Sequence, residues 1–307
     1  MRARTAFFGV LSVVAPFTMP TGALAQAAGF GPVVLQLPAS TRAIGFGNAY
    51  VAIREPEAVF YNPAQLGVRP GVAMSVARYD TTATAGAVTA TYVFGPIGFG
   101  FGVQYLDFDA ATPFYPAVSP NGEALLAGGP FPASSLVAAL AFEMAYKGIR
   151  WGVAGKFAED RVATFRDGVI MADVGAAKEI GPGTAGISIQ NLGGSARVAG
   201  TSAALPTRVN AGYAAAAPIG PLDAVASAAV SVRRGGRVSP AGGLELGYMP
   251  IEGISVAGRI GARLPEKNAE APVTLGASFT FDRLTVDYGF EPYQGPGSAH
   301  RIGLRIR

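Results

Sequence analysis

The stretch VTLGASFTFDRLTVDYGF, residues 273–290, decides the fold class of this chain. Up to Phe281, large apolar residues alternate with small or polar ones, and beyond Asp282 the same alternation runs on to Phe290. Because successive side chains of a β-strand point to opposite faces, the stretch predicts two antiparallel strands joined by a tight turn. Each strand would have one large apolar face and one face of small or polar residues.

The same alternation recurs in IGFGFGVQY (97–105), ISVAGRIGARL (254–264) and HRIGLRIR (300–307). A soluble antiparallel sheet also alternates, with its apolar face on a packed core and its polar face in water. Here the second face consists mainly of Gly, Ala, Ser and Thr, which suits a narrow, partly filled barrel lumen. The pattern therefore favours a transmembrane barrel, whose apolar face meets lipid, over a sandwich.

Four arginines, Arg259, Arg263, Arg301 and Arg305, fall on the small-residue face of these stretches. They are therefore expected to point into the lumen. There they could attract a carboxylate ligand, although pairing with acidic residues of the lumen or of the N-terminal segment is the favoured interpretation.

The composition agrees with a membrane barrel. Charged residues make up 14% of the chain, against about 25% in ordinary globular domains. Hydrophobic residues reach 50%, yet beyond residue 25 no apolar run approaches the roughly 20 residues of a transmembrane helix. A transmembrane β-barrel fits both facts, because its apolar residues alternate with polar ones along each strand.

Residues 1–25 have the pattern of a secretory signal peptide. Arg2 and Arg4 precede the apolar stretch 7–19, and Ala23-Leu24-Ala25 is a suitable cleavage site. Cleavage would leave 22 Lys and Arg against 20 Asp and Glu, a near-neutral balance that gives no argument for nucleic acid. With no Cys and one His, little material exists for metal or Ser-His-Asp sites. No enzyme activity and no cofactor or metal is expected.

About fourteen strands are predicted after residue 70, an even number as single-chain bacterial barrels require. They lie near 71–79, 84–94, 96–106, 134–146, 149–159, 167–179, 184–192, 207–217, 223–233, 238–248, 253–264, 271–281, 283–291 and 299–307. The phase of 207–217 and 223–233 is unclear because both are rich in alanine. The transmembrane barrel would thus span residues 70–307.

The predicted links between strands alternate in length. Six are very short, and the longer ones lie near 107–134, 159–167, 193–206, 265–271 and 291–299. Bacterial barrels have short periplasmic turns and longer extracellular loops. Residues 107–134 are therefore expected outside the cell and residues 146–148 in the periplasm.

Residues 26–69 do not alternate and contain many Pro and Gly residues, yet they are too apolar for a solvated tail. We call this segment the hatch and expect it to fill the lumen as a plug. Glu55 and Glu57 are interpreted as solvated charges on a hatch loop, not as a catalytic pair. His300 is expected to hydrogen bond at the barrel rim instead of binding metal.

RAIGFGNAYVA (42–52) and AVFYNPAQLG (58–67) resemble the N-terminal signature of the PorV/PorQ family of outer-membrane proteins, and DYGFEPYQGPGSAHRIGL (287–304) resembles that family's last hairpin. The resemblance implies the fourteen-strand barrel and N-terminal hatch shared with FadL, the long-chain fatty-acid transporter. It also implies that the backbone packs tightly at Gly45 and Gly47, and that Asn62 and Pro63 form a turn before the first strand. Arg42 opens the signature.

Two functions from different classes follow from the resemblance. In the first, the chain is a non-enzymatic PorV-like barrel in outer-membrane lipid that binds secretion-system components or secreted cargo, as in type IX secretion. In the alternative, it is a FadL-like transporter for a hydrophobic small molecule, with the hatch as its gate.

Overall fold

The computed structural model describes residues 31–67, 70–79, 83–110, 117–118, 124–125, 131–162, 165–198, 201–264, 272–293 and 297–307. The predicted signal peptide at 1–25 and the first hatch residues, 26–30, lie outside the described residues.

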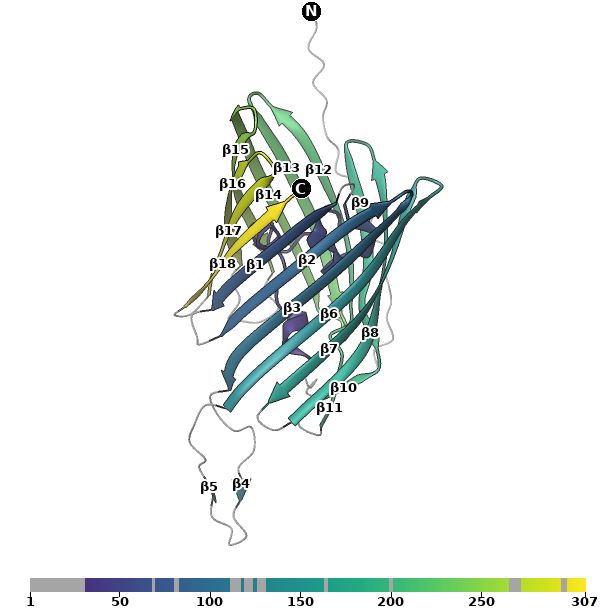
Figure 1. Ribbon diagram of the computed structural model, residues 1–307, viewed down its shortest axis with the longest axis vertical. Helices are drawn as coiled ribbons and strands as arrows, with labels where there is room; N and C mark the ends of the chain where they lie inside the picture. The colour runs from purple at the N-terminus through teal and green to yellow at the C-terminus, as the bar shows by residue number, and fades with distance from the viewer. Residues whose placement is uncertain are drawn as a thin grey trace, which may run out of the picture.

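Fourteen strands of the described chain form one closed antiparallel barrel, which confirms the predicted fold class (Figure 1). Each barrel strand pairs with the next barrel strand along the chain, and the first pairs with the last, so no sheet edge remains open. The strands are β1 (Gly71–Tyr79), β2 (Thr84–Phe94), β3 (Ile97–Ala110), β6 (Phe131–Tyr146), β7 (Ile149–Val162), β8 (Phe165–Ile180), β9 (Gly183–Gly193), β12 (Arg208–Ile219), β13 (Leu222–Arg233), β14 (Val238–Ile251), β15 (Ile254–Arg263), β16 (Val273–Phe281), β17 (Leu284–Pro292) and β18 (Ser298–Ile306).

The two faces of the wall have the predicted chemistry. In β16, Val273, Leu275 and Phe279 are exposed on the outside, whereas Thr274 is fully buried on the inside. The same holds in β18, where Ile302 is exposed and its neighbour Arg301 is buried. The outer wall is therefore an apolar surface suited to hydrocarbon, and the inner wall is polar or small.

All six predicted short turns lie at one end of the barrel, and the longer connections lie at the other. The link predicted near 159–167 is not one of the longer ones: β7 and β8 stay paired up to Val162 and Phe165, which leaves two residues between the strands. Arg161 and Arg166 both bind Glu159 at that hairpin, which supports pairing where the strands are expected to leave the membrane. Two small hairpins inside longer links were not predicted: β4 (Ala117–Val118) with β5 (Ala124–Leu125), and β10 (Ser195–Val198) with β11 (Thr201–Ala204).

The described part of the hatch lies within the strand wall, where Figure 1 shows it in purple. It contains the short helices η1 (Val33–Gln36), α1 (Thr41–Gly45), η2 (Pro56–Phe60) and η3 (Pro63–Gln65). Among the described residues, no helix is long and apolar enough to cross a membrane.

The small residues of the inner wall leave room for the hatch backbone. A Cβ atom at Gly152 would overlap the backbone at Pro63, and one at Gly261 would overlap the backbone at Gly47. Hatch side chains fill the remaining space, and Phe46 among them is fully buried. The inner face is therefore shaped to a filled interior and not to an open pore.

Candidate functional site

Arg42 joins the hatch to the barrel wall. Ser40 caps α1 by accepting a hydrogen bond from the Ala43 amide, and the side chain of Arg42 extends from that helix to β14. There its Nε and Nη2 atoms donate to the two carboxylate oxygens of Glu245 at 3.0 and 2.6 Å. Its Nη1 atom also binds Glu55 of the hatch. Two-point guanidinium–carboxylate contacts are among the strong ion pairs in proteins.

Arg259 and Arg305 extend this network along the wall. Arg305 on β18 binds Glu55 at 2.9 Å and Asp287 on β17 at 2.7 Å. Arg259 on β15 binds the same Asp287 at 2.8 Å and also Glu245. A continuous network of ion pairs therefore runs from the hatch to four strands of the wall, β14, β15, β17 and β18.

The prediction that Glu55 and Glu57 are solvated was wrong. Their exposed fractions are 1% and 5%. Burial alone would raise the pKa of Glu55, but the guanidinium groups of Arg305, Arg42 and Arg307 hold it well below its usual range. The pKa of Glu57 is raised, first by burial and then by the Glu55 carboxylate beside it. The sequence could not show this, because Arg305 and Arg307 are about 250 positions from Glu55 and reach it only in the folded barrel.

The remaining two predicted arginines have different partners. Arg263 lies near the long-connection end and binds Glu291 at 2.7 Å. Arg301 is buried on the inside of β18 and donates to the hydroxyl of Ser75 on β1 at 2.9 Å. His300 hydrogen bonds with Tyr288 at 2.7 Å, as expected, and points to the outer face of the wall.

The glycines and the Asn-Pro pair of the hatch signature lie at close contacts. A Cβ atom at Gly45 would lie 2.8 Å from the Cβ atom of Arg259. Gly47 has a φ angle of +62° and sits against the backbone of Ala262. Asn62 caps η3, because its side-chain oxygen accepts from the amide of Ala64, and Pro63 occupies the first position of that helix.

A second group of charges lies where the hatch joins the barrel. Glu143 on β6 accepts from the amide of Leu66 at 2.8 Å and binds Arg54 at 2.6 Å. Arg150 on β7 donates to the hatch at Gln65 and also binds Glu179 on β8. These contacts fix the part of the hatch that precedes β1.

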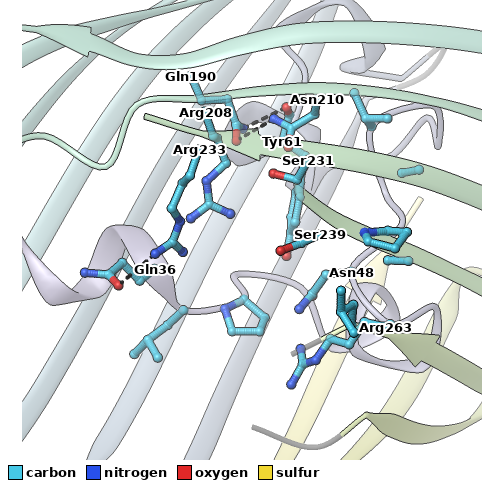
Figure 2. A pocket seen from close by; sticks show the side chains of 18 of the residues that line it. Gln36, Asn48, Tyr61, Gln190, Arg208, Asn210, Ser231, Arg233, Ser239 and Arg263 are labelled. Atoms are coloured by element: carbon cyan, nitrogen blue, oxygen red, sulfur yellow. Dashed lines mark hydrogen bonds between the residues drawn. The ribbon is translucent and has the colours of Figure 1, made fainter. Parts of the chain in front are cut away.

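A cavity of about 180 Å³ opens between the hatch and the wall at the long-connection end (Figure 2). We call it the outer cavity; its walls include Gln36, Tyr61, Arg208, Ser231, Arg233 and Arg263. Figure 2 shows Arg208 and Arg233 side by side near Gln36, with Arg263 in another part of the cavity.

A smaller cavity of about 50 Å³, the inner cavity, lies next to the outer one. The two share Leu37, Tyr61, Gln190 and Arg208. Leu35 and Phe60 make part of the inner cavity apolar. Burial raises the pKa of Tyr61 to about 12, so this phenol stays neutral and accepts hydrogen bonds from the amides of Ala39 and Ser40. The two cavities therefore lie side by side between the hatch and the wall.

Sequence reasoning missed the polar residues that line the outer cavity. Arg208 and Asn210 on β12, and Ser231 and Arg233 on β13, all point inward. They belong to the two alanine-rich strands whose phase was unclear. Arg208 and Asn210 are two positions apart, and so are Ser231 and Arg233. This spacing could have indicated the lumen face of both strands, because polar residues at alternate positions of a barrel strand point into the lumen.

The fold, compared with solved structures, is that of FadL-type outer-membrane barrels. The Pseudomonas putida toluene transporter TodX matches with a TM-score of 0.55 and 10% identity, over 86% of this chain and 96% of that chain. The monoaromatic hydrocarbon channel CymD matches with 0.58 and 10%, over 87% and 96%. A Pseudomonas aeruginosa FadL homologue matches with 0.56 and 10%, over 88% and 98%. No protein-family model and no curated protein matches the sequence.

Proposed function

We propose that this chain is a bacterial outer-membrane barrel that lets small molecules with an apolar body pass through its interior. The observation that carries the proposal is a closed barrel whose lumen holds the hatch and, beside the hatch, the outer and inner cavities. Two of the structurally similar proteins are described as a toluene transporter and a monoaromatic hydrocarbon channel. The alternative function inferred from the sequence is thus supported better than a role in type IX secretion.

Passage requires part of the hatch to move. Phe60 of the hatch and Lys156 of β7 both line the inner cavity, and Lys156 is held by Asp173 at 2.5 Å. At the other end, Arg42 and Glu55 tie the hatch to β14 and β18. We propose that the hatch gates the lumen and that Arg42, Gly45, Gly47, Asn62 and Pro63 hold it in its closed position.

A second candidate function is favoured by the N-terminal signature at 42–67, which resembles that of the PorV/PorQ family. In this case the barrel would bind a partner or secreted cargo at the outer membrane. Capture of the full chain in detergent from its own cells distinguishes the two. Recovery of secretion-system components or secreted cargo in stoichiometric amount would support the second candidate.

An engineered disulfide tests the gate directly, because the chain contains no cysteine. A Cβ atom at Gly289 of β17 would lie 3.3 Å from the Cβ atom of Ile44 in α1, close to the 3.5–4.5 Å typical of disulfides. Ile44→Cys with Gly289→Cys should therefore pin α1 to the wall once oxidised. We expect radiolabelled toluene to enter Gram-negative cells faster when they carry the wild-type chain than when they carry none. The oxidised double variant should abolish this gain, and a reductant should restore it.

Leu66→Cys with Gly98→Cys is the matched control. These Cβ atoms would lie 3.9 Å apart, but the bond would pin only the end of the hatch that is already tethered to β1. Its uptake rate should equal the wild-type rate. Wild-type uptake no faster than in cells without the chain would contradict passage. Equal uptake by the oxidised and reduced Ile44 and Gly289 variant would contradict gating by the hatch.

A further inference from the structure

We propose that the outside of the barrel wall binds a phosphate-bearing lipid of the outer leaflet, with an acyl chain at Gly86 and the phosphate at Arg78. The site lies on β18, β1, β2 and β3, which are neighbours in the wall (Figure 1). It is separate from the outer and inner cavities, which lie between the hatch and the wall. The inference goes beyond the proposed function and does not depend on passage through the lumen.

A groove of about 570 Å³ crosses these four strands on the outside of the wall, and we call it the wall groove. Gly86 on β2 lies directly opposite Val76 of β1 and Tyr105 of β3. Val76 and Tyr105 are exposed on the outside, and the missing side chain at Gly86 leaves a gap between them. The lining also includes five apolar residues, Met74, Val88, Val103, Ile302 and Leu304. The wall groove is therefore an apolar trough that faces the hydrocarbon of the membrane.

On β1 and β18 the apolar surface ends in a basic residue next to the wall groove. The next outward-facing residues toward the long-connection end are Arg78 and His300, which lie directly opposite each other. Both ring nitrogens of His300 already hydrogen bond, one with the hydroxyl of Tyr288 and the other with that of Ser298. Arg78 is exposed and its guanidinium group has no ion-pair partner among the described residues. Arg78 is therefore the group that can bind a ligand here.

The position of Arg78 favours a headgroup phosphate as its partner. Charged residues on the lipid face are tolerated near the membrane interface, where anionic headgroups attract Arg and Lys, and the guanidinium fork matches the geometry of a phosphate. Thr84 of β2, directly opposite Arg78, offers a hydroxyl as a second donor. The exposed carboxylate of Asp107 lies opposite Thr84 on β3. Because Asp107 would repel a phosphate, the headgroup is expected on the β1 side of this row.

The two parts of the site have different roles. An acyl chain gains little by leaving other chains for the wall groove, because lipid tails are as apolar as the groove itself. Selectivity therefore rests on the phosphate, and the groove determines where the chain lies. Since the long-connection end is expected outside the cell, the lipid would come from the outer leaflet and would cover the seam where β1 pairs with β18.

Two lipids with the same acyl chains test the phosphate: radiolabelled dipalmitoyl phosphatidate and dipalmitoylglycerol, each added to the full chain in detergent. The wild type should retain at least about fivefold more phosphatidate than dipalmitoylglycerol, because one arginine near a membrane surface contributes about that factor. Arg78→Gln should lower phosphatidate retention by about fivefold and leave dipalmitoylglycerol retention unchanged. Excess inorganic phosphate should not displace the phosphatidate.

Gly86→Leu tests the wall groove, because the new side chain would fill it. Retention of both lipids should fall. The nearest atom to a Cβ atom at Gly86 would be the carbonyl oxygen of Ser75, at 3.6 Å, so the barrel should still form. Arg234→Gln is the matched control for Arg78→Gln, because Arg234 is also exposed at the long-connection end but lies between β13 and β14. It should retain both lipids as the wild type does.

Equal retention of the two lipids by the wild type would overturn the phosphate site, and this comparison needs no variant to fold. Unchanged retention by Gly86→Leu would overturn the wall groove. Displacement by inorganic phosphate would mean that Arg78 binds a free ion instead of a lipid. A wild-type dimer in light scattering that Gly86→Leu converts to a monomer would make a second copy of the chain the occupant. The proposed passage is tested separately, by toluene uptake into cells.

Discussion

Glu55 and Glu57 are two residues apart and both buried, yet the protein treats their carboxyl groups in opposite ways. Glu55 is surrounded by guanidinium groups, which favour its charged form. Glu57 accepts a hydrogen bond from Ser40 at 3.2 Å, but its other oxygen has no partner among the described residues. Its raised pKa follows from that burial and from the charge on Glu55. The negative charge of Glu55 therefore stabilises the docked hatch, whereas a negative charge on Glu57 does not.

Glu57→Gln should stabilise the folded barrel at pH 8 and have no effect at pH 4. The raised pKa means that Glu57 contributes its stability fully below the usual value of 4.5, and loses it as the pH rises through the folded-state pKa. Glutamine keeps the acceptor for Ser40 and has no such loss. The temperature at which unboiled protein changes mobility on a gel, measured at both pH values, checks this. An equal shift at both would mean that the effect does not come from ionisation.

Gly47→Ala should destabilise hatch docking more than Gly148→Ala destabilises its turn. Both glycines have positive φ angles, +62° and +75°, so both variants carry the left-handed strain of about 1–2 kcal/mol. Only at Gly47 would the new Cβ atom also lie 2.7 Å from the carbonyl oxygen of Ala262; at Gly148 nothing lies within 4 Å. The free energy of unfolding in denaturant distinguishes them. Equal losses would show that the wall contact at Gly47 is unimportant.

At the scale of elements, the sequence predicts the strands well and the hatch contacts poorly. Strands that alternate large and small residues, such as β16, were predicted to within two residues, because alternation is a local property. β12 and β13 were also predicted as strands, but the sequence did not show which of their residues face the lumen, since alanine fits either face. The ion pair of Glu55 with Arg305 joins residues 250 positions apart, so it depends on barrel closure, which no local pattern records. The outer cavity was missed for both reasons.

Deletion of residues 31–67 should leave a barrel that still inserts, because the strand pairing lies in residues after Pro70. The lumen would then be empty, and the single-channel conductance in planar bilayers should rise well above that of the full chain. Gel mobility before and after boiling confirms insertion. Equal, low conductance would mean that the loops close the pore, and equal, high conductance would mean that the full chain is already open.

For the whole molecule, the two ends of the barrel differ, and this fixes its expected orientation. The six short turns predicted from the sequence lie at one end, where the hatch enters β1, and the longest connections, between β3 and β6 and between β9 and β12, lie at the other (Figure 1). The outer cavity opens at the long-connection end, which would face the exterior. Ligands arriving from outside would therefore meet Arg208 and Arg233 before they reach the ion network around Glu55.

An epitope tag near Asn121, in the link between β3 and β6, should be accessible to antibody on intact cells. A tag at Lys147, in the turn between β6 and β7, should become accessible only after the outer membrane is permeabilised. Asn121 itself lies outside the described residues. Labelling of Lys147 but not Asn121 on intact cells would mean that the barrel stands the other way up.

The pairing of β1 with β18 has a consequence for biogenesis. The hatch and β1 leave the ribosome first and β18 last among the barrel strands, yet Glu55 is held by Arg305 of β18 and Asp287 lies beside it on β17. Glu55 therefore lacks its partner on β18 until the last barrel strand is in place. When β18 meets β1, the seam closes and Arg305 reaches Glu55 in the same event. Each newly made copy would thus gain its wall and its plug together, and its insertion would not leave a leak in the envelope.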